Sequence, residues 1–162
     1  MLTANDIIIR GLAGSQALLN RYTADLTPAE FLHRPAAAAN CTAWLIGHLA
    51  MSDRRVLTQM GAADLPPLPD GFEKRFSRDE GCPQAADFGD VTGLMAIFNR
   101  HRELLIERVK AASNEALDKP LEKPHPMFGK VGEMVAFMSL HTAMHAGQIT
   151  IVRRSLGRPP LM

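Results

Sequence analysis

The sequence predicts an all-α fold, a four-helix bundle with a long crossover connection between the second and third helices. Four segments of about twenty residues show the apolar periodicity of amphipathic helices, strand signals are nearly absent, and one connection is too long for a tight turn. Helices of this kind bury their apolar stripes by packing against one another. The 162 residues are expected to form a single domain.

The first predicted helix runs from about Thr3 to Tyr22 and opens on Thr3 or Asn5 as its N-cap. A short helical segment follows at 27–30, where the order Thr, Pro, Ala, Glu has the form of a capping box. Pro28 occupies the first helical position, which tolerates proline well. Both N-termini are therefore marked by local side chains.

The other three long helices are bounded by similar signals. They are expected over about 40–61, 90–113 and 129–156. Gly157 and Pro159 end the last of them, because glycine commonly follows the last helical residue and proline cannot continue the helix.

The crossover connection covers 61–90 and contains four prolines. Its Phe72, Phe76 and Phe88 give it apolar side chains to bury. Long crossover connections of this kind often lie across a site, so this one is predicted to act as a lid.

Three histidines are the strongest functional signal. His141 and His145 are four residues apart in a predicted helix, so both rings project from one face about one turn apart. His48 ends the run 44–48 on the second helix. Two helices can thus bring three imidazoles to one point, which predicts a metal site with these three ligands.

All three rings are predicted to face the core, because their neighbours on the same stripes are mostly apolar. Buried imidazoles without partners would have lowered pKa values and unpaired nitrogens, whereas a divalent ion satisfies one lone pair per ring. The alternative is three core histidines satisfied by hydrogen bonds. Three neutral ligands would leave coordination positions open, as in catalytic rather than closed structural sites.

The neighbours of the histidines refine this prediction. The zinc-protease signature is missing, because Thr142 and Ala143 follow His141 where that motif has its general-base Glu. Gln148 is a candidate to orient a ligand ring, or else an amide in helix packing.

Two further residues are candidates for the pocket. His101 on the third helix is a candidate to line the cavity or complete the coordination, and Trp44 to form a pocket wall or pack in the core. Asp53, five residues after His48, is predicted to be a solvated charge.

Composition excludes several functions. The 18 basic and 17 acidic residues nearly balance, and no basic cluster is interleaved with aromatics, so a nucleic-acid partner is not expected. No segment predicts a membrane span or a signal peptide, so we expect a soluble cytoplasmic protein with no membrane partner. In a reducing compartment Cys41 and Cys82 are predicted to stay unpaired, the first in the core and the second in a loop.

Several motifs together resemble the DinB-like superfamily. They are the run 44–50 with His48, the run 129–134 that opens the fourth helix, the pair His141 and His145 followed by Gly-Gln-Ile, and the ending 156–160. The resemblance implies a four-helix bundle with a long crossover and a divalent ion, nickel or zinc, held by the three histidines. It also implies a homodimer.

The resemblance also implies a range of activities. Members of the superfamily include thiol-dependent S-transferases, such as those that use bacillithiol, mycothiol-dependent isomerases and metal-dependent hydrolases. We therefore expect an ion that activates water or a low-molecular-weight thiol toward a small electrophilic substrate. The alternative is a non-catalytic, metal-containing dimeric stress or binding protein.

Overall fold

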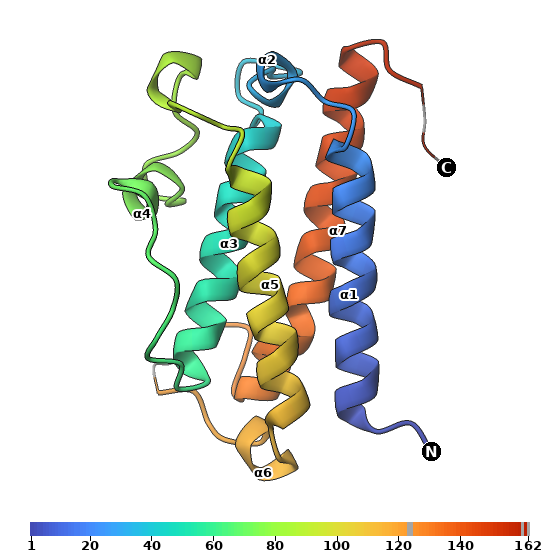
Figure 1. Cartoon of the computed structure of the whole chain (residues 1–162), viewed down its shortest axis with the longest axis vertical. Helices are drawn as coiled ribbons and strands as arrows, with labels where there is room; N and C mark the ends of the chain where they lie inside the picture. The colour runs from blue at the N-terminus through green and yellow to red at the C-terminus, as the bar shows by residue number, and fades with distance from the viewer. Residues whose placement is uncertain (123–124, 160, 162) are drawn as a thin grey trace.

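The computed structural model describes residues 1–122, 125–159 and 161. Four long helices, α1 (Ala4–Thr23), α3 (Thr42–Gln59), α5 (Leu94–Ala111) and α7 (Val131–Ser155), form a bundle, which confirms the predicted fold (Figure 1). Short helices lie between them: α2 (Pro28–Phe31), α4 (Phe72–Arg75), the 3₁₀ turn η1 (Ala85–Asp87) and α6 (Asn114–Leu117). Within these ranges there is no strand beyond one isolated bridge, and no helix is both long and apolar enough to cross a bilayer.

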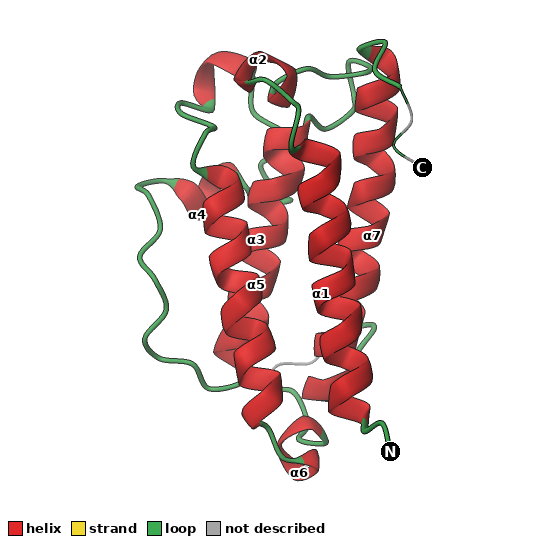
Figure 2. Ribbon diagram, turned by 45° about the vertical axis from the view of Figure 1, so that its right-hand side comes forward, coloured by secondary structure: helices red, strands yellow, loops and turns green. Residues whose placement is uncertain are grey.

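The order of helices around the bundle explains the long connection. Helix α1 packs against α5 and α7, and α3 packs against the same two helices. The colours of Figure 1 show that α3 and α5 run in one direction while α1 and α7 run in the other. Because α3 and α5 are parallel neighbours, the chain must return along their full length, and it does so outside them through the crossover that carries α4 (Figure 2).

Capping explains where α1 and α2 begin. Thr3 accepts a hydrogen bond from the amide of Asp6 and forms the capping box of α1, and Thr27 forms the box predicted for α2. Helix α5 begins four residues later than predicted. The carboxylate of Asp90 accepts hydrogen bonds from the backbone amide and hydroxyl of Thr92, and such a turn competes with the helix.

The crossover is anchored in the core, as its aromatic residues predict. Phe72, Phe76 and Phe88 are each at most 2% exposed and belong to one cluster with residues of α3 and α5. The ring of Phe76 lies directly against Gly47, where a Cβ would come within 2.3 Å of it. This close approach places the crossover beside His48.

The prediction for Asp53 was wrong. Its side chain is fully buried and accepts two hydrogen bonds from Arg102, at 2.7 and 3.0 Å. The same guanidinium donates to Leu12, Ser15 and Thr142, so it joins all four long helices. Asp53 lies inside because α5 supplies the cation that pairs with it, a contact that local periodicity does not contain.

Candidate metal centre

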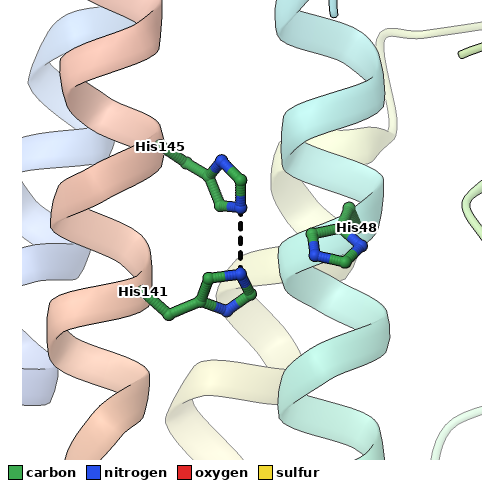
Figure 3. Close-up of side chains that lie close together, drawn as sticks. All are labelled: His48, His141 and His145. Carbon is green, nitrogen blue, oxygen red and sulfur yellow. Dashed lines mark hydrogen bonds between the residues drawn. The ribbon is translucent and has the colours of Figure 1, made fainter. Parts of the chain in front are cut away.

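Helices α3 and α7 bring the three histidines together (Figure 3). One ring nitrogen each of His48, His141 and His145 lies within 4.8 Å of the others. The Nε2 atoms of His141 and His145 are 2.9 Å apart, and the ring of His48 meets both at nearly a right angle. The turn-spaced pair on α7 thus faces a single ring across the gap between the two helices.

The triad lies at the edge of the core. His48 is 8% exposed, but His141 and His145 are only half-buried. The buried stripe of α7 passes through Thr142 and Ala146, one position away from the histidines. The prediction that all three rings face the interior is therefore corrected: the pair on α7 flanks the stripe, because the stripe itself is occupied by Thr142 and its contact with the buried guanidinium.

Two of the three rings are held by a neighbouring side chain, Trp44 or Gln148. Trp44 stacks on His48 with ring centroids 4.8 Å apart and planes 4° apart. Gln148 Oε1 lies 2.7 Å from Nδ1 of His145. Because that oxygen can only accept, Nδ1 of His145 carries the proton, and in the neutral ring the lone pair lies on Nε2, which faces His141.

The electrostatic environment keeps the rings neutral. Burial, followed by the neighbouring His145, lowers the pKa of His48 to about 4 and that of His141 to about 3. Burial also lowers the pKa of His145, opposed by its hydrogen bond to Gln148. Neutral imidazoles offer the lone pairs that a cation needs.

The donor set fits a divalent ion. Two nitrogens bound to one ion at about 2.0–2.1 Å lie roughly 2.9–3.4 Å apart in octahedral or tetrahedral geometry, and the pair on α7 is already at the lower bound. The Nδ1 atom of His141 is buried without a hydrogen-bond partner in the described structure. No hydrogen bond at Nδ1 therefore fixes the ring of His141 in the way that Gln148 fixes the ring of His145. Three imidazoles suit zinc, nickel, copper and iron alike.

His101 does not join this group. It is 1% exposed; its Nδ1 lies 2.8 Å from the carbonyl of Ile97, and its Nε2 lies 3.4 Å from Arg54. The structure thus places His101 in a separate contact between α5 and α3, and the cluster of possible ligands found in the described residues contains only the other three histidines. Trp44 is 5% exposed and contributes to the site by stacking on a ring.

A hollow of about 340 Å³ opens beside His48. Residues 48–55 of α3 form one wall, and residues 73–79 of the crossover form the other, including Phe76 and Arg78. Larger hollows of about 470 and 530 Å³ lie elsewhere, and none of the three histidines lines them. The crossover therefore borders His48, the one histidine of the cluster that lines this hollow, and its role as a lid stays a prediction.

Sequence reasoning missed two contacts of the site. Phe137 packs on the ring of His141, with centroids 5.7 Å apart. Thr142, the residue after His141, receives a hydrogen bond from Arg102. A signal for the second was present, because Arg102 lies on the apolar stripe of α5, one turn after Phe98.

The fold and the cluster together define a class of proteins: four-helix bundles with two histidines on the last helix and a third on another. The chain belongs to the DinB superfamily, whose family model matches residues 12–149 and so includes all three histidines. A comparison with curated proteins found no match.

A similar solved structure is YfiT from Bacillus subtilis, described as a probable metal-dependent hydrolase with an unusual four-helix bundle topology. The TM-score is 0.67, and the alignment covers 96% of this chain and 89% of that one. At 15% sequence identity, this similarity supports the fold alone.

Proposed function

We propose that this protein is a metal-dependent enzyme in which His48, His141 and His145 hold one divalent ion, nickel or zinc. When bound, the ion would activate water or a low-molecular-weight thiol toward a small electrophilic substrate. The observation that carries the proposal is the meeting of three neutral imidazoles, one of which, His48, lines a hollow large enough for a small molecule.

The composition of the cluster supports catalysis over a closed structural site. It contains three histidines and no carboxylate or thiolate among the described residues, so a four-coordinate ion would keep at least one position for a ligand from solution. The description of YfiT supports a hydrolase reaction. The thiol reaction is supported by the resemblance of the sequence motifs to the DinB-like superfamily, which includes thiol-dependent enzymes.

The first test is the metal content of tag-free protein. We expect about one divalent ion per chain, and almost none in the His48→Ala variant, measured by inductively coupled plasma mass spectrometry. The His125→Ala variant is the matched control, because His125 is exposed and lies outside the cluster. A parent protein that stays metal-free after reconstitution with nickel or zinc would overturn the proposal.

A second test separates the enzyme from the non-catalytic alternative. In cobalt-substituted protein, adding 2-mercaptoethanol should shift the visible absorption bands, because an open position lets a thiolate reach the ion. Unchanged bands, with the metal content retained, would favour a metal-containing binding protein without turnover.

We also propose that the protein is a homodimer and works in the cytoplasm. Support for the dimer comes from Leu140, Met144 and Ile151, which follow one face of α7 and are each more than half exposed. Large apolar side chains grouped in this way commonly mark an interface. Sedimentation should give twice the chain mass for the parent, and a lower mass for Met144→Glu.

A further inference from the structure

Two cysteines that are distant in the sequence meet at the start of α3. Cys41 occupies the N-cap position of α3, and Cys82 lies on the crossover between α4 and η1. Their Sγ atoms are 3.7 Å apart, and both are free thiols. The two residues are forty-one positions apart in the sequence, so their contact depends on how the crossover is anchored.

Several contacts hold the segment around Cys82 in place. The guanidinium of Arg34 donates to the carbonyl oxygen of Cys82, at 2.7 Å, and to that of Pro83. The side chain of Cys82 packs against the core cluster to which Cys41 belongs. Hydrogen bonds to the backbone at 82–83 and packing of the Cys82 side chain therefore both hold the sulfur of Cys82 beside that of Cys41.

The two thiols differ in accessibility. Cys41 is 0% exposed, and burial raises the pKa of its thiol to about 12. Cys82 is only half-buried. A small oxidant from solution meets Cys82 first, and the thiol of Cys41, with its Sγ 3.7 Å away, is then the neighbouring group that can react with the oxidised sulfur.

We propose that Cys41 and Cys82 form an oxidation site, a dithiol that a peroxide converts into a reversible intramolecular disulfide. The sulfur of Cys82 attacks one peroxide oxygen, the O–O bond breaks, and the leaving oxygen takes the thiol proton of Cys82 and departs as water, or as an alcohol from an organic peroxide. The sulfur of Cys41 then attacks the sulfenic sulfur of Cys82, the S–O bond breaks, and the leaving hydroxyl takes the thiol proton of Cys41 and departs as water, so that the S–S bond forms. Two electrons pass from the thiols to the peroxide, and a low-molecular-weight thiol returns them.

The disulfide would tie the crossover to α3 two turns before His48. The same crossover supplies Phe76 and Arg78 to the wall of the hollow. Oxidation thus restricts the motion of one wall of the candidate site. A reducing compartment does not oppose this role, because disulfides in such compartments are usually transient and redox-responsive.

The test uses the reduced full-length protein with a metal chelator present, so it does not depend on the proposed metal. After hydrogen peroxide treatment, the chain is unfolded by a denaturant in the presence of N-ethylmaleimide, which alkylates free thiols, and its intact mass is measured. We expect no N-ethylmaleimide adduct on either cysteine and a mass about 2 Da below that of the reduced, unalkylated chain. Treatment with dithiothreitol before alkylation should restore both adducts. Sulfinic or sulfonic acids, or a disulfide between two chains, as the main product would overturn the proposal.

Single variants test the order of the two steps. Cys41→Ser should leave a sulfenic acid on Cys82 that dimedone traps. Cys82→Ser should leave Cys41 unreacted in the folded protein, because that thiol is buried. Rapid oxidation of Cys41 in this variant would contradict the assignment of Cys82 as the first sulfur to react.

Limited proteolysis tests the tether itself in the parent chain. Trypsin cleavage after Arg78, which is exposed on the crossover, should slow by about tenfold or more in the disulfide form, since local opening of the segment becomes harder. Equal cleavage rates in both forms would show that the bond does not restrain the crossover.

Discussion

At the scale of single residues, the three histidines of the candidate site are supported unequally. His48 is stacked against Trp44, and His145 is fixed by a hydrogen bond to Gln148. His141 has aromatic contacts, but its Nδ1 is buried without a partner in the described structure. The orientation of the pair on α7 therefore depends most on Gln148, which sets the proton position of one ring.

Replacing Gln148 with Ala should weaken divalent-ion affinity by about 10- to 100-fold, because Nδ1 of His145 loses its acceptor. Competition with a chromophoric chelator measures this affinity. Gln84→Ala is the control, since Gln84 is exposed and lies on the crossover away from the cluster. Equal divalent-ion affinity in the Gln148→Ala and Gln84→Ala variants would show that Gln148 contributes to helix packing and not to ion binding.

At the scale of elements, the crossover and α3 fit together at Gly47. In a helix interior, Ala is normally more stabilising than Gly. At position 47, however, the ring of Phe76 occupies the space that an added Cβ would need, so this contact decides how a substitution changes the stability. Because His48 follows directly, this contact links the position of the crossover to one ring of the site. The ring of His48 also borders the hollow.

Gly47→Ala should lower the free energy of unfolding by about 1–3 kcal/mol, because the new Cβ would overlap the ring of Phe76. Gly14→Ala on α1 is the matched control. Nothing lies within 4 Å of its added Cβ, so it should stabilise the protein by roughly 0.5–1 kcal/mol. Urea denaturation measures both, and the same sign for the two would refute the predicted clash.

The end of α7 is joined to α2 and the preceding connection by ion pairs. Arg153, which is almost fully buried, pairs with Asp25, and Arg158 pairs with both Asp25 and Glu30. Arg153 holds the pKa of Asp25 at about 2, and Arg158 holds that of Glu30 at about 2. Both values lie below those of the unfolded chain.

The stabilisation from these carboxylates is therefore complete above about pH 5 and is lost as the pH falls toward 2. The midpoint of thermal unfolding should fall across this interval. In Asp25→Asn/Glu30→Gln it should fall less steeply, whereas Asp64→Asn, at an exposed carboxyl without an ion pair in the described structure, should follow the parent. An unchanged slope in the double variant would contradict the prediction.

At the scale of the whole molecule, one guanidinium joins the four long helices. Arg102 of α5 contacts Leu12 and Ser15 of α1, Asp53 of α3 and Thr142 of α7. Burial raises the pKa of Asp53, and the adjacent guanidinium opposes that rise. Since α3 and α7 also carry the histidines, the same network holds the two halves of the site at their spacing.

Asp53→Ala should destabilise the fold by about 3–5 kcal/mol, because it leaves a buried guanidinium without its counter-charge. The double variant Asp53→Leu/Arg102→Met removes both charges and should be clearly more stable than the single variant. Urea unfolding with a double-mutant comparison measures this difference. A double variant as unstable as Asp53→Ala would show that the charges are not the main cause.

The sequence alone predicted much of this protein, and local interactions explain why. Helix spans follow from the apolar period and from caps such as Thr3 and Thr27, which act within one turn. The pairing of His141 with His145 follows from helical spacing in the same way. The crossover was predicted from its length, its prolines and its aromatic residues.

Tertiary structure decided the rest. It buried Asp53 against Arg102, turned the histidine pair to the edge of the core, separated His101 from the cluster, and brought Cys82 to Cys41. These outcomes depend on how far each helix is rotated about its axis and where the crossover returns. Both are set by contacts between segments that are distant along the chain, so the local sequence pattern does not contain them.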